Sequence, residues 1–107
     1  YVEDIAGAAK VTVLYGPPTE AAEFERYYFE RHLPLASTLQ NLRKTEIAKV
    51  VASPGQAAPP YYRIAELWFD SSDTLQEALG SAAGQAVAAD LANFASGGAT
   101  ILVTSLS

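Results

Sequence analysis

The sequence predicts an α+β fold of the ferredoxin-like βαββαβ type, with an antiparallel sheet that carries both helices on one face. Runs rich in β-branched and aromatic residues occur at 10–16, 42–51, 61–69 and 99–106. Segments with apolar residues at helical spacing separate the first run from the second and the third from the fourth. With 107 residues the chain has the size of one domain, assigned to residues 10–107, and residues 1–9 form an N-terminal segment without assigned structure.

The first strand and helix are read from the segment before residue 37. Residues 10–16, KVTVLYG, stop at a glycine followed by two prolines, which predicts a strand and then a turn, with Thr19 as the cap of a helix. Because Pro34 disfavours helical backbone at the preceding residue and lacks an N–H donor, we expect the helix to end or kink at His32–Leu33. The predicted apolar stripe of this helix comprises Ala21, Phe24, Tyr28, His32 and Leu35.

The second half repeats this order after two consecutive strands. The strands at 42–51 and 61–69 are separated by SPGQAAPP, which is too long for a tight hairpin. Four polar residues at 71–74 offer caps for a short helix that ends at Gly80, and Ser81 begins a second helical stretch closed by Gly97 and Gly98. The stripe of that second stretch is Ala83, Val87, Leu91 and Phe94.

Both rows of the third strand contain large apolar side chains. Tyr62, Ile64, Glu66 and Trp68 form one row, and the alternate residues from Tyr61 to Phe69 form the other. Helices on one side of the sheet cover only one row, and soluble monomers rarely expose an apolar sheet face. We therefore expect a homodimer in which two sheet faces meet and enclose a space.

Composition excludes several classes of function. The formal net charge of −5 disfavours nucleic acid as a partner, and no apolar run approaches the roughly 20 residues of a membrane span. The absence of cysteine excludes thiol catalysis, and one histidine makes a dedicated metal site improbable. Neither GxGxxG nor GxxxxGK[ST] follows a strand, so the sequence predicts no cofactor. We expect a soluble, cytoplasmic protein.

Acid–base or binding chemistry remains, and His32, Tyr28 and Glu66 are the candidate catalytic residues. His32 transfers protons near neutral pH, and Tyr28, one turn earlier on the same stripe, can orient the same ligand atom. Glu66 is a carboxylate in an otherwise apolar row. The alternatives are that His32 caps a helix end and that Glu66 pairs with Lys44, Arg43 or Lys49 of the neighbouring strand.

Three aromatic residues are candidates for the wall of a ligand pocket: Tyr27, Tyr62 and Trp68. The alternative is that they belong to the core or to a dimer interface. Asp90 interrupts the second helical stripe, and for this residue we expect a local capping or interhelix hydrogen bond.

Three segments resemble a known family. FERYYFERHLPLASTL, RIAELWFDS and GQAVAADLANFA are similar to segments of the EthD family, within the dimeric α+β barrel superfamily, and the resemblance spans roughly residues 10–106. It implies a ferredoxin-like subunit that dimerises through its sheets, with His32 of the HLPLA segment as a functional residue. The family takes its name from a protein encoded beside a cytochrome P450 system for ethyl tert-butyl ether degradation, and it is commonly classed with oxidoreductase activity.

The resemblance and the residues together lead to three hypotheses. The first is a protein that binds or transforms a small apolar or aromatic organic molecule in a barrel cavity, as a cofactor-independent oxidoreductase or a cofactor-free isomerase, lyase or cyclase. The second is a non-catalytic module that carries such a compound for a partner oxygenase. The third is a haem-related role with His32 as the only histidine ligand.

Overall fold

The four strands form one antiparallel sheet. The computed structural model describes residues 7–106, so residues 1–6 of the predicted N-terminal segment, and Ser107, lie outside the described residues. The strands are β1 (Ala9–Tyr15), β2 (Lys44–Lys49), β3 (Arg63–Phe69) and β4 (Ala99–Ser105). Their order in the sheet is β2-β3-β1-β4, with β1 and β3 in the centre, which confirms the predicted ferredoxin-like fold.

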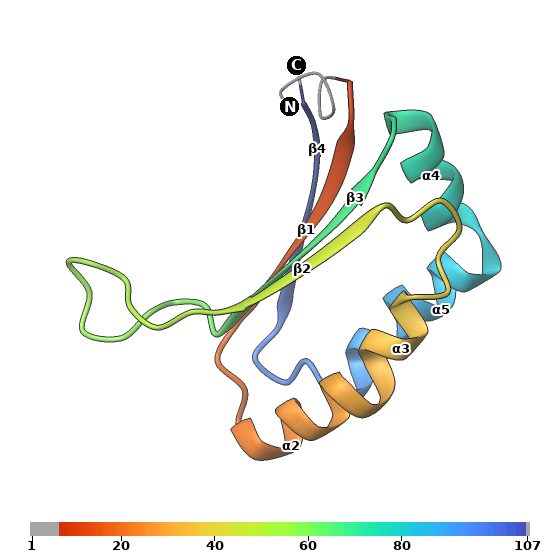
Figure 1. Ribbon diagram of the computed structural model, residues 1–107. Coiled ribbons are helices and arrows are strands. Elements are labelled where there is room, and N and C mark those ends of the chain that lie inside the picture. The colour runs from red at the N-terminus through yellow and green to blue at the C-terminus, as the bar shows by residue number, and fades with distance from the viewer. Residues whose placement is uncertain (1–6, 107) are drawn as a thin grey trace.

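The helices all lie on one side of this sheet (Figure 1). The first helical segment runs through α2 (Ala21–Tyr27), the π-helical turn η1 (Tyr28–His32) and α3 (Leu33–Ala36). The second comprises α4 (Ser72–Gly80), α5 (Ala82–Asp90) and the 3-10 turn η2 (Leu91–Asn93). One face of the sheet is therefore covered and the other, the bare face, carries no helix.

Of the two outcomes expected at His32–Leu33, an end or a kink of the helix, the end does not occur, and the helix type changes there instead. The N–H of Leu33 donates to the carbonyl of Tyr28, five residues earlier, and the chain then continues as α3. Pro34 lies in the first turn of α3, where a missing N–H costs little, and the wider π turn before it accommodates the proline ring. Pro34 thus changes the hydrogen-bond register of the helix and does not terminate it.

The predicted cap of this helix is also wrong. Glu20 occupies the N-cap position without a side-chain hydrogen bond. Thr19 instead contacts Ser96 through both its backbone N–H, at 3.0 Å, and its hydroxyl, at 3.3 Å. Thr19 therefore ties the start of the first helical segment to the loop before β4.

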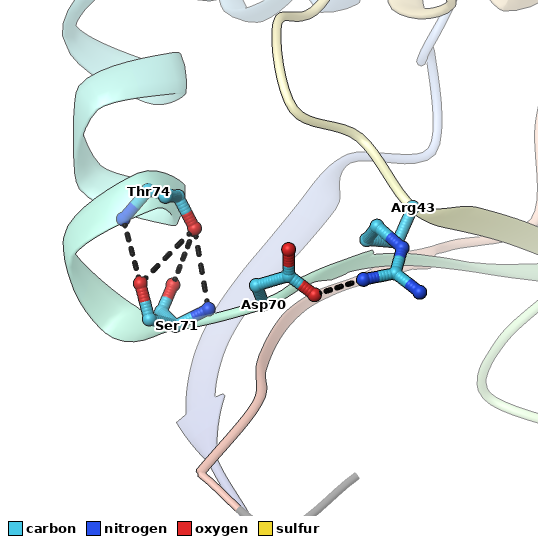
Figure 2. A network of polar contacts seen from close by, with 4 residues as sticks. All are labelled: Arg43, Asp70, Ser71 and Thr74. Carbon is cyan, nitrogen blue, oxygen red and sulfur yellow. Dashed lines mark hydrogen bonds and ion pairs between the residues drawn. The ribbon is translucent and has the colours of Figure 1, made fainter. Parts of the chain in front are cut away.

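The start of α4 has the predicted cap. Ser71 accepts the N–H of Thr74 at 3.1 Å, and the Thr74 hydroxyl accepts the N–H of Ser71 at 3.2 Å, a reciprocal capping box (Figure 2). Beside it Arg43 donates to Asp70, which joins the residue before β2 to the end of β3. The long loop between β2 and β3 projects away from the sheet and the helices (Figure 1).

The core lies between the helices and the covered face of the sheet. The most completely buried large side chains are Tyr15, Tyr28, Phe69 and Leu75. Alternate residues of β1 and β3 point toward the helices, as the period of two in a strand requires. At the covered face, Gly84 lets α5 approach α4, because a Cβ at this position would lie 2.2 Å from the Ala78 carbonyl oxygen.

Candidate functional site

A cavity of about 170 Å³ lies between the helical layer and the covered face of the sheet. Its walls come from all four strands, from α3, α4 and α5, and from the two helical turns η1 and η2. Most of the lining side chains are aliphatic, and the exposed residues Thr45, Ala88 and Ile101 lie where the wall reaches the surface. The hydrogen-bonding side chains of the wall are Tyr15, Tyr28, His32 and Thr45.

The π turn places two of these polar side chains on the wall of the cavity. Phe24, Tyr28, His32 and Ala36 are spaced by four residues, and all four are buried. Because a π turn takes up more residues than an α turn, a strict spacing of four keeps them on one side of the helix. The rings of Tyr28 and His32 stack with their centroids 5.9 Å apart and their planes 16° from parallel.

His32 forms a hydrogen bond with a carboxylate of the other helical segment. Its Nδ1 lies 2.9 Å from Oδ2 of Asp90. The other oxygen of Asp90 accepts the Tyr27 hydroxyl at 2.6 Å and the Asn93 amide at 3.0 Å. The predicted interhelix hydrogen bond of Asp90 is confirmed, and one of its partners is the candidate catalytic histidine.

This network fixes which nitrogen of His32 carries a proton. Burial acts to raise the pKa of Asp90, but hydrogen bonds from Tyr27, Asn93 and His32 outweigh burial and lower it. Asp90 is therefore ionised at neutral pH and only accepts hydrogen bonds, so Nδ1 of His32 must be the donor. Within residues 7–106, Nε2 makes no hydrogen bond, and it is the nitrogen left to meet a ligand in the cavity.

The two tyrosines of the wall remain protonated. Burial raises the pKa of Tyr28 to about 12, although the charge of Arg63 acts in the opposite direction. Burial, and then the neighbouring Tyr28, also raise the pKa of Tyr15. The Tyr28 hydroxyl is buried, and it has no hydrogen-bond partner in the part of the chain that the structure describes. The cavity wall therefore contains two neighbouring neutral phenols: the hydroxyls of Tyr15 and Tyr28 are close enough to influence each other's pKa, and that of Tyr28 has no partner at full hydrogen-bond geometry among the described residues.

A partly buried ion pair lies beside Tyr28. Arg63 binds Glu25 through two hydrogen bonds, Nε to Oε2 at 2.8 Å and Nη2 to Oε1 at 2.6 Å. The Arg63 guanidinium carbon lies 5.7 Å from the centre of the Tyr28 ring and 5.1 Å from that of Phe29. The Tyr28 ring therefore contacts both a guanidinium group and the imidazole of His32.

The structure brings together only some of the predicted site residues. His32 and Tyr28 share the cavity, and Tyr27 touches the same network through Asp90. Glu66 and Trp68 lie on the bare face instead, where Glu66 pairs with Lys10 of β1 at 2.7 Å. The predicted ion pair of Glu66 therefore exists, but its partner is on β1 and not on β2.

Tyr62 also leaves the row in which the sequence placed it. It precedes the first residue of β3, and its ring meets Phe24 of α2 edge-on, with centroids 5.3 Å apart. The strand period consequently does not extend to residue 62. Tyr62 packs with the helices and does not line the cavity.

Two residues of this site, Tyr15 on the cavity wall and Asp90 behind His32, were not among the predicted site residues. Tyr15 appeared only as the end of a strand, and Asp90 only as a hydrogen-bonding residue. The sequence did contain one indication for Asp90: this carboxylate directly precedes Leu91, a residue of the apolar stripe, on a helix that covers the sheet.

The part of the chain that the structure describes, residues 7–106, contains neither a metal-binding cluster nor a membrane-spanning helix. No three His, Cys, Asp or Glu side chains converge there in a way that could hold a metal ion. No helix among residues 7–106 is long and apolar enough to cross a membrane.

Comparison with protein families and relatives agrees with this picture. The EthD domain model matches residues 16–98. A relative from Rhodococcus erythropolis, described as an uncharacterized 11.0 kDa protein in the thcB-thcC intergenic region, is 37% identical over 95 residues, which are 89% of this chain and 91% of that protein. An ethyl tert-butyl ether d (ethd) family protein from Bacillus halodurans superposes with a TM-score of 0.86 at 27% identity, covering 94% of this chain and 99% of that one.

More distant solved structures share the fold alone. SnoaB, a cofactor-independent oxygenase from Streptomyces nogalater, has a TM-score of 0.68 at 13% identity, over 94% of this chain and 93% of that chain. A dimeric protein with a ferredoxin-like fold from Bacteroides fragilis has a TM-score of 0.65 at 18% identity, over 95% and 99%. The fold therefore occurs both in dimers and in an enzyme that works without a cofactor.

Proposed function

The chain belongs to the EthD family, and from this premise we propose that it binds a small apolar or aromatic organic molecule in its cavity and acts on it through His32. The volume of about 170 Å³ supports this, because an apolar cavity of about 150 Å³ accommodates a benzene ring. The ligand class is thus a compound built on one ring, with a mostly apolar surface.

The single observation that carries the proposal is the pairing of His32 with Asp90 at the cavity wall. A carboxylate that accepts from Nδ1 leaves Nε2 as a base and stabilises the imidazolium that forms when Nε2 takes a proton. Such a group needs no metal or cofactor to move a proton. In this proposal His32 is the acid–base group and Tyr28 the donor that orients the ligand.

A non-catalytic module for a partner oxygenase is the second candidate function. The unused donor on Tyr28 and the apolar walls would serve retention of a ligand as well as its conversion. The role of Nε2 separates the two candidates, since retention does not require a base.

Binding is tested with phenylacetone, a one-ring ketone, followed by saturation-transfer NMR. We expect binding to the unchanged chain, no binding to Ala88→Phe, which fills the cavity where its wall reaches the surface, and full binding to the control Glu30→Gln on the exposed side of η1. Folding of each variant is checked by circular dichroism. Equal binding by the Ala88 variant would show that the ligand lies elsewhere.

Catalysis is tested on the same ligand with His32→Asn. This variant keeps a polar side chain of intermediate size but has no base at the Nε2 position. If the chain is an enzyme, His32→Asn abolishes proton exchange of bound phenylacetone and binding persists. If the unchanged chain binds phenylacetone without accelerating its proton exchange, the retention function replaces the catalytic one.

We propose further that two copies associate through the bare face. Leu14, Ile64 and Trp68 lie there only half covered, and β4 exposes Leu102 on the same face, opposite Thr12. Trp68 is flanked by Lys10 and Lys44, whose Nζ atoms lie 4.8 and 5.3 Å from its ring. Light scattering at micromolar concentration is expected to give twice the 11.4 kDa monomer mass, and Ile64→Lys to give the monomer. A monomer mass for the unchanged chain would overturn this proposal.

A further inference from the structure

The buried Tyr28 hydroxyl is the feature of the cavity that the fold itself does not explain. Tyr28 is completely buried, yet its donor has no partner in the described part of the chain. Leaving such a group unsatisfied costs about 1–3 kcal/mol, whereas phenylalanine would pack the same ring without this cost. A hydrogen-bond acceptor that is supplied from outside the chain removes the penalty.

The surroundings of Tyr28 restrict the chemistry of this acceptor. Tyr15 lies beside it on the cavity wall, with ring centroids 5.4 Å apart, so two neutral phenols are close together. Asp90 is turned toward His32 and Tyr27, and Glu25 is bound by Arg63, so neither carboxylate serves the phenols. Two neutral donors in an apolar cavity suit an uncharged oxygen that gains negative charge during a reaction.

His32 lies next to Tyr28 on the same wall of the cavity. Its ring is nearly parallel to that of Tyr28, and Asp90 holds Nδ1, so Nε2 is the free nitrogen. Because the two ring centroids are only 5.9 Å apart, one small ligand can touch both side chains, with its oxygen at the Tyr28 hydroxyl and a neighbouring carbon atom at Nε2. A base and an oxyanion donor on adjacent atoms of one ligand are what enolisation requires.

We propose that the ligand of the cavity is a ketone or aldehyde whose carbonyl oxygen accepts hydrogen bonds from Tyr28 and Tyr15, and that His32 removes a proton from the carbon next to that carbonyl. This inference rests on the proposed function and narrows it to one substrate class. The C–H bond breaks, its electron pair forms the C=C bond of the enolate, and the carbonyl π pair moves to the oxygen. The proton passes to Nε2 and returns from there to carbon, so no oxidant or reductant is consumed.

The first arm of the test compares two ligands that differ only in the carbonyl group, phenylacetone and propylbenzene. We expect the unchanged chain to bind the ketone about tenfold more tightly, which is the effect of one net hydrogen bond. In Tyr28→Phe the preference should fall to about one while the affinity for propylbenzene stays the same. Circular dichroism verifies that this variant, which keeps the packed ring, is folded.

The second arm follows hydrogen–deuterium exchange of the phenylacetone methylene group by ¹H NMR in D₂O. The unchanged chain should accelerate exchange over buffer, Tyr28→Phe should slow it, and His32→Asn should abolish it. Failure of the unchanged chain to accelerate exchange of bound ketone would overturn the proton-transfer step.

The outcomes distinguish this inference from the proposed function. If propylbenzene and phenylacetone bind the unchanged chain equally, the cavity is a ligand site but the carbonyl inference is wrong, and Tyr15 or a water molecule is the partner of Tyr28. The same conclusion follows if the ketone preference survives in Tyr28→Phe. If neither compound binds, the proposed function and the inference both fail.

Discussion

Asparagine at position 90 should change the protonation of His32 and lower the stability of the fold. In the present structure Oδ1 of Asp90 accepts from Tyr27 and Asn93, and Oδ2 accepts from His32. Asparagine has only one oxygen, so its NH₂ group must face one of these donors. If the oxygen stays with Tyr27 and Asn93, the amide donates to Nδ1 of His32, and the imidazole proton moves to Nε2.

The expected loss of stability in Asp90→Asn follows from the hydrogen bonds that the substitution exchanges. A hydrogen bond to a charged group contributes about 1.5–3 kcal/mol, and a neutral one about 0.5–1.5 kcal/mol. Asp90 and His32 are both largely buried, with side chains 11% and 5% exposed, so solvent screens this bond little. We expect Asp90→Asn to cost about 1.5 kcal/mol, which corresponds to a fall in Tm of roughly 6–12 °C for a domain of this size.

The single histidine makes the assay direct. Long-range ¹H–¹⁵N NMR of the neutral ring should show a proton on Nδ1 in the unchanged chain and on Nε2 in Asp90→Asn. Thermal unfolding is compared at one protein concentration, because association shifts Tm. The control Asp73→Asn removes an exposed carboxylate from α4 and should cost less than about 0.5 kcal/mol. A proton on Nε2 in the unchanged chain would refute the assigned direction of the His32–Asp90 hydrogen bond.

Three further predictions concern stability. The hydrogen bond from Arg63 is the main cause that lowers the pKa of Glu25 below its usual 4.5. The unfolded chain therefore binds this proton more readily than the folded chain does. The stability that results is fully present above pH 4.5 and is lost as the pH falls through the lowered pKa. The urea midpoint should therefore decrease as the pH is lowered below about 4.5, and this decrease should be less steep in Glu25→Gln. Parallel curves of midpoint against pH for the two chains would contradict a stabilising role of the ion pair. Tyr28→Phe should raise the free energy of unfolding by about 1 kcal/mol, because it removes an unsatisfied donor; a loss of that size in urea titrations would mean that the hydroxyl has a partner. Gly84→Ala should lower the free energy of unfolding by about 1–3 kcal/mol, since the new Cβ would overlap the carbonyl of Ala78. An unchanged urea midpoint would show that α4 and α5 can separate freely.

The order of strands and helices could be predicted from the sequence because each depends on local periodicity. Val11, Val13 and Tyr15 alternate with half-covered residues, and the Ser71 cap is a local pattern of four residues. The continuation of the helix past Pro34 could not be predicted in the same way. The proline rule concerns an α turn, and a π turn satisfies the same backbone groups with a different register.

The candidate site could be predicted only in part, since it depends on which elements meet. His32 and Tyr28 share a helical stripe, so their proximity follows from spacing alone. Asp90 reaches His32 only because α5 and η2 pack against η1, a contact between distant parts of the chain. Glu66 has β1 on one side and β2 on the other, and Lys10 and Lys44 lie at equivalent positions on these strands, both opposite Trp68. Lys44 pairs with Glu46 of its own strand at 3.7 Å, and Lys10 becomes the partner of Glu66.

The distribution of polarity along the first helical segment gives a reason to place function at the cavity. Phe24 and Ala36, at the two ends of the buried stripe, are apolar, while Tyr28 and His32, between them, carry the polar atoms that meet the cavity. Apolar side chains in place of Tyr28 and His32 would cover the sheet without an unsatisfied hydroxyl or a buried imidazole that needs a carboxylate. Local departures from the stable choice are expected where a protein binds or reacts. Since both departures in this stripe border the same cavity, a ligand in that cavity accounts for them together, whereas a purely structural role for the helix accounts for neither.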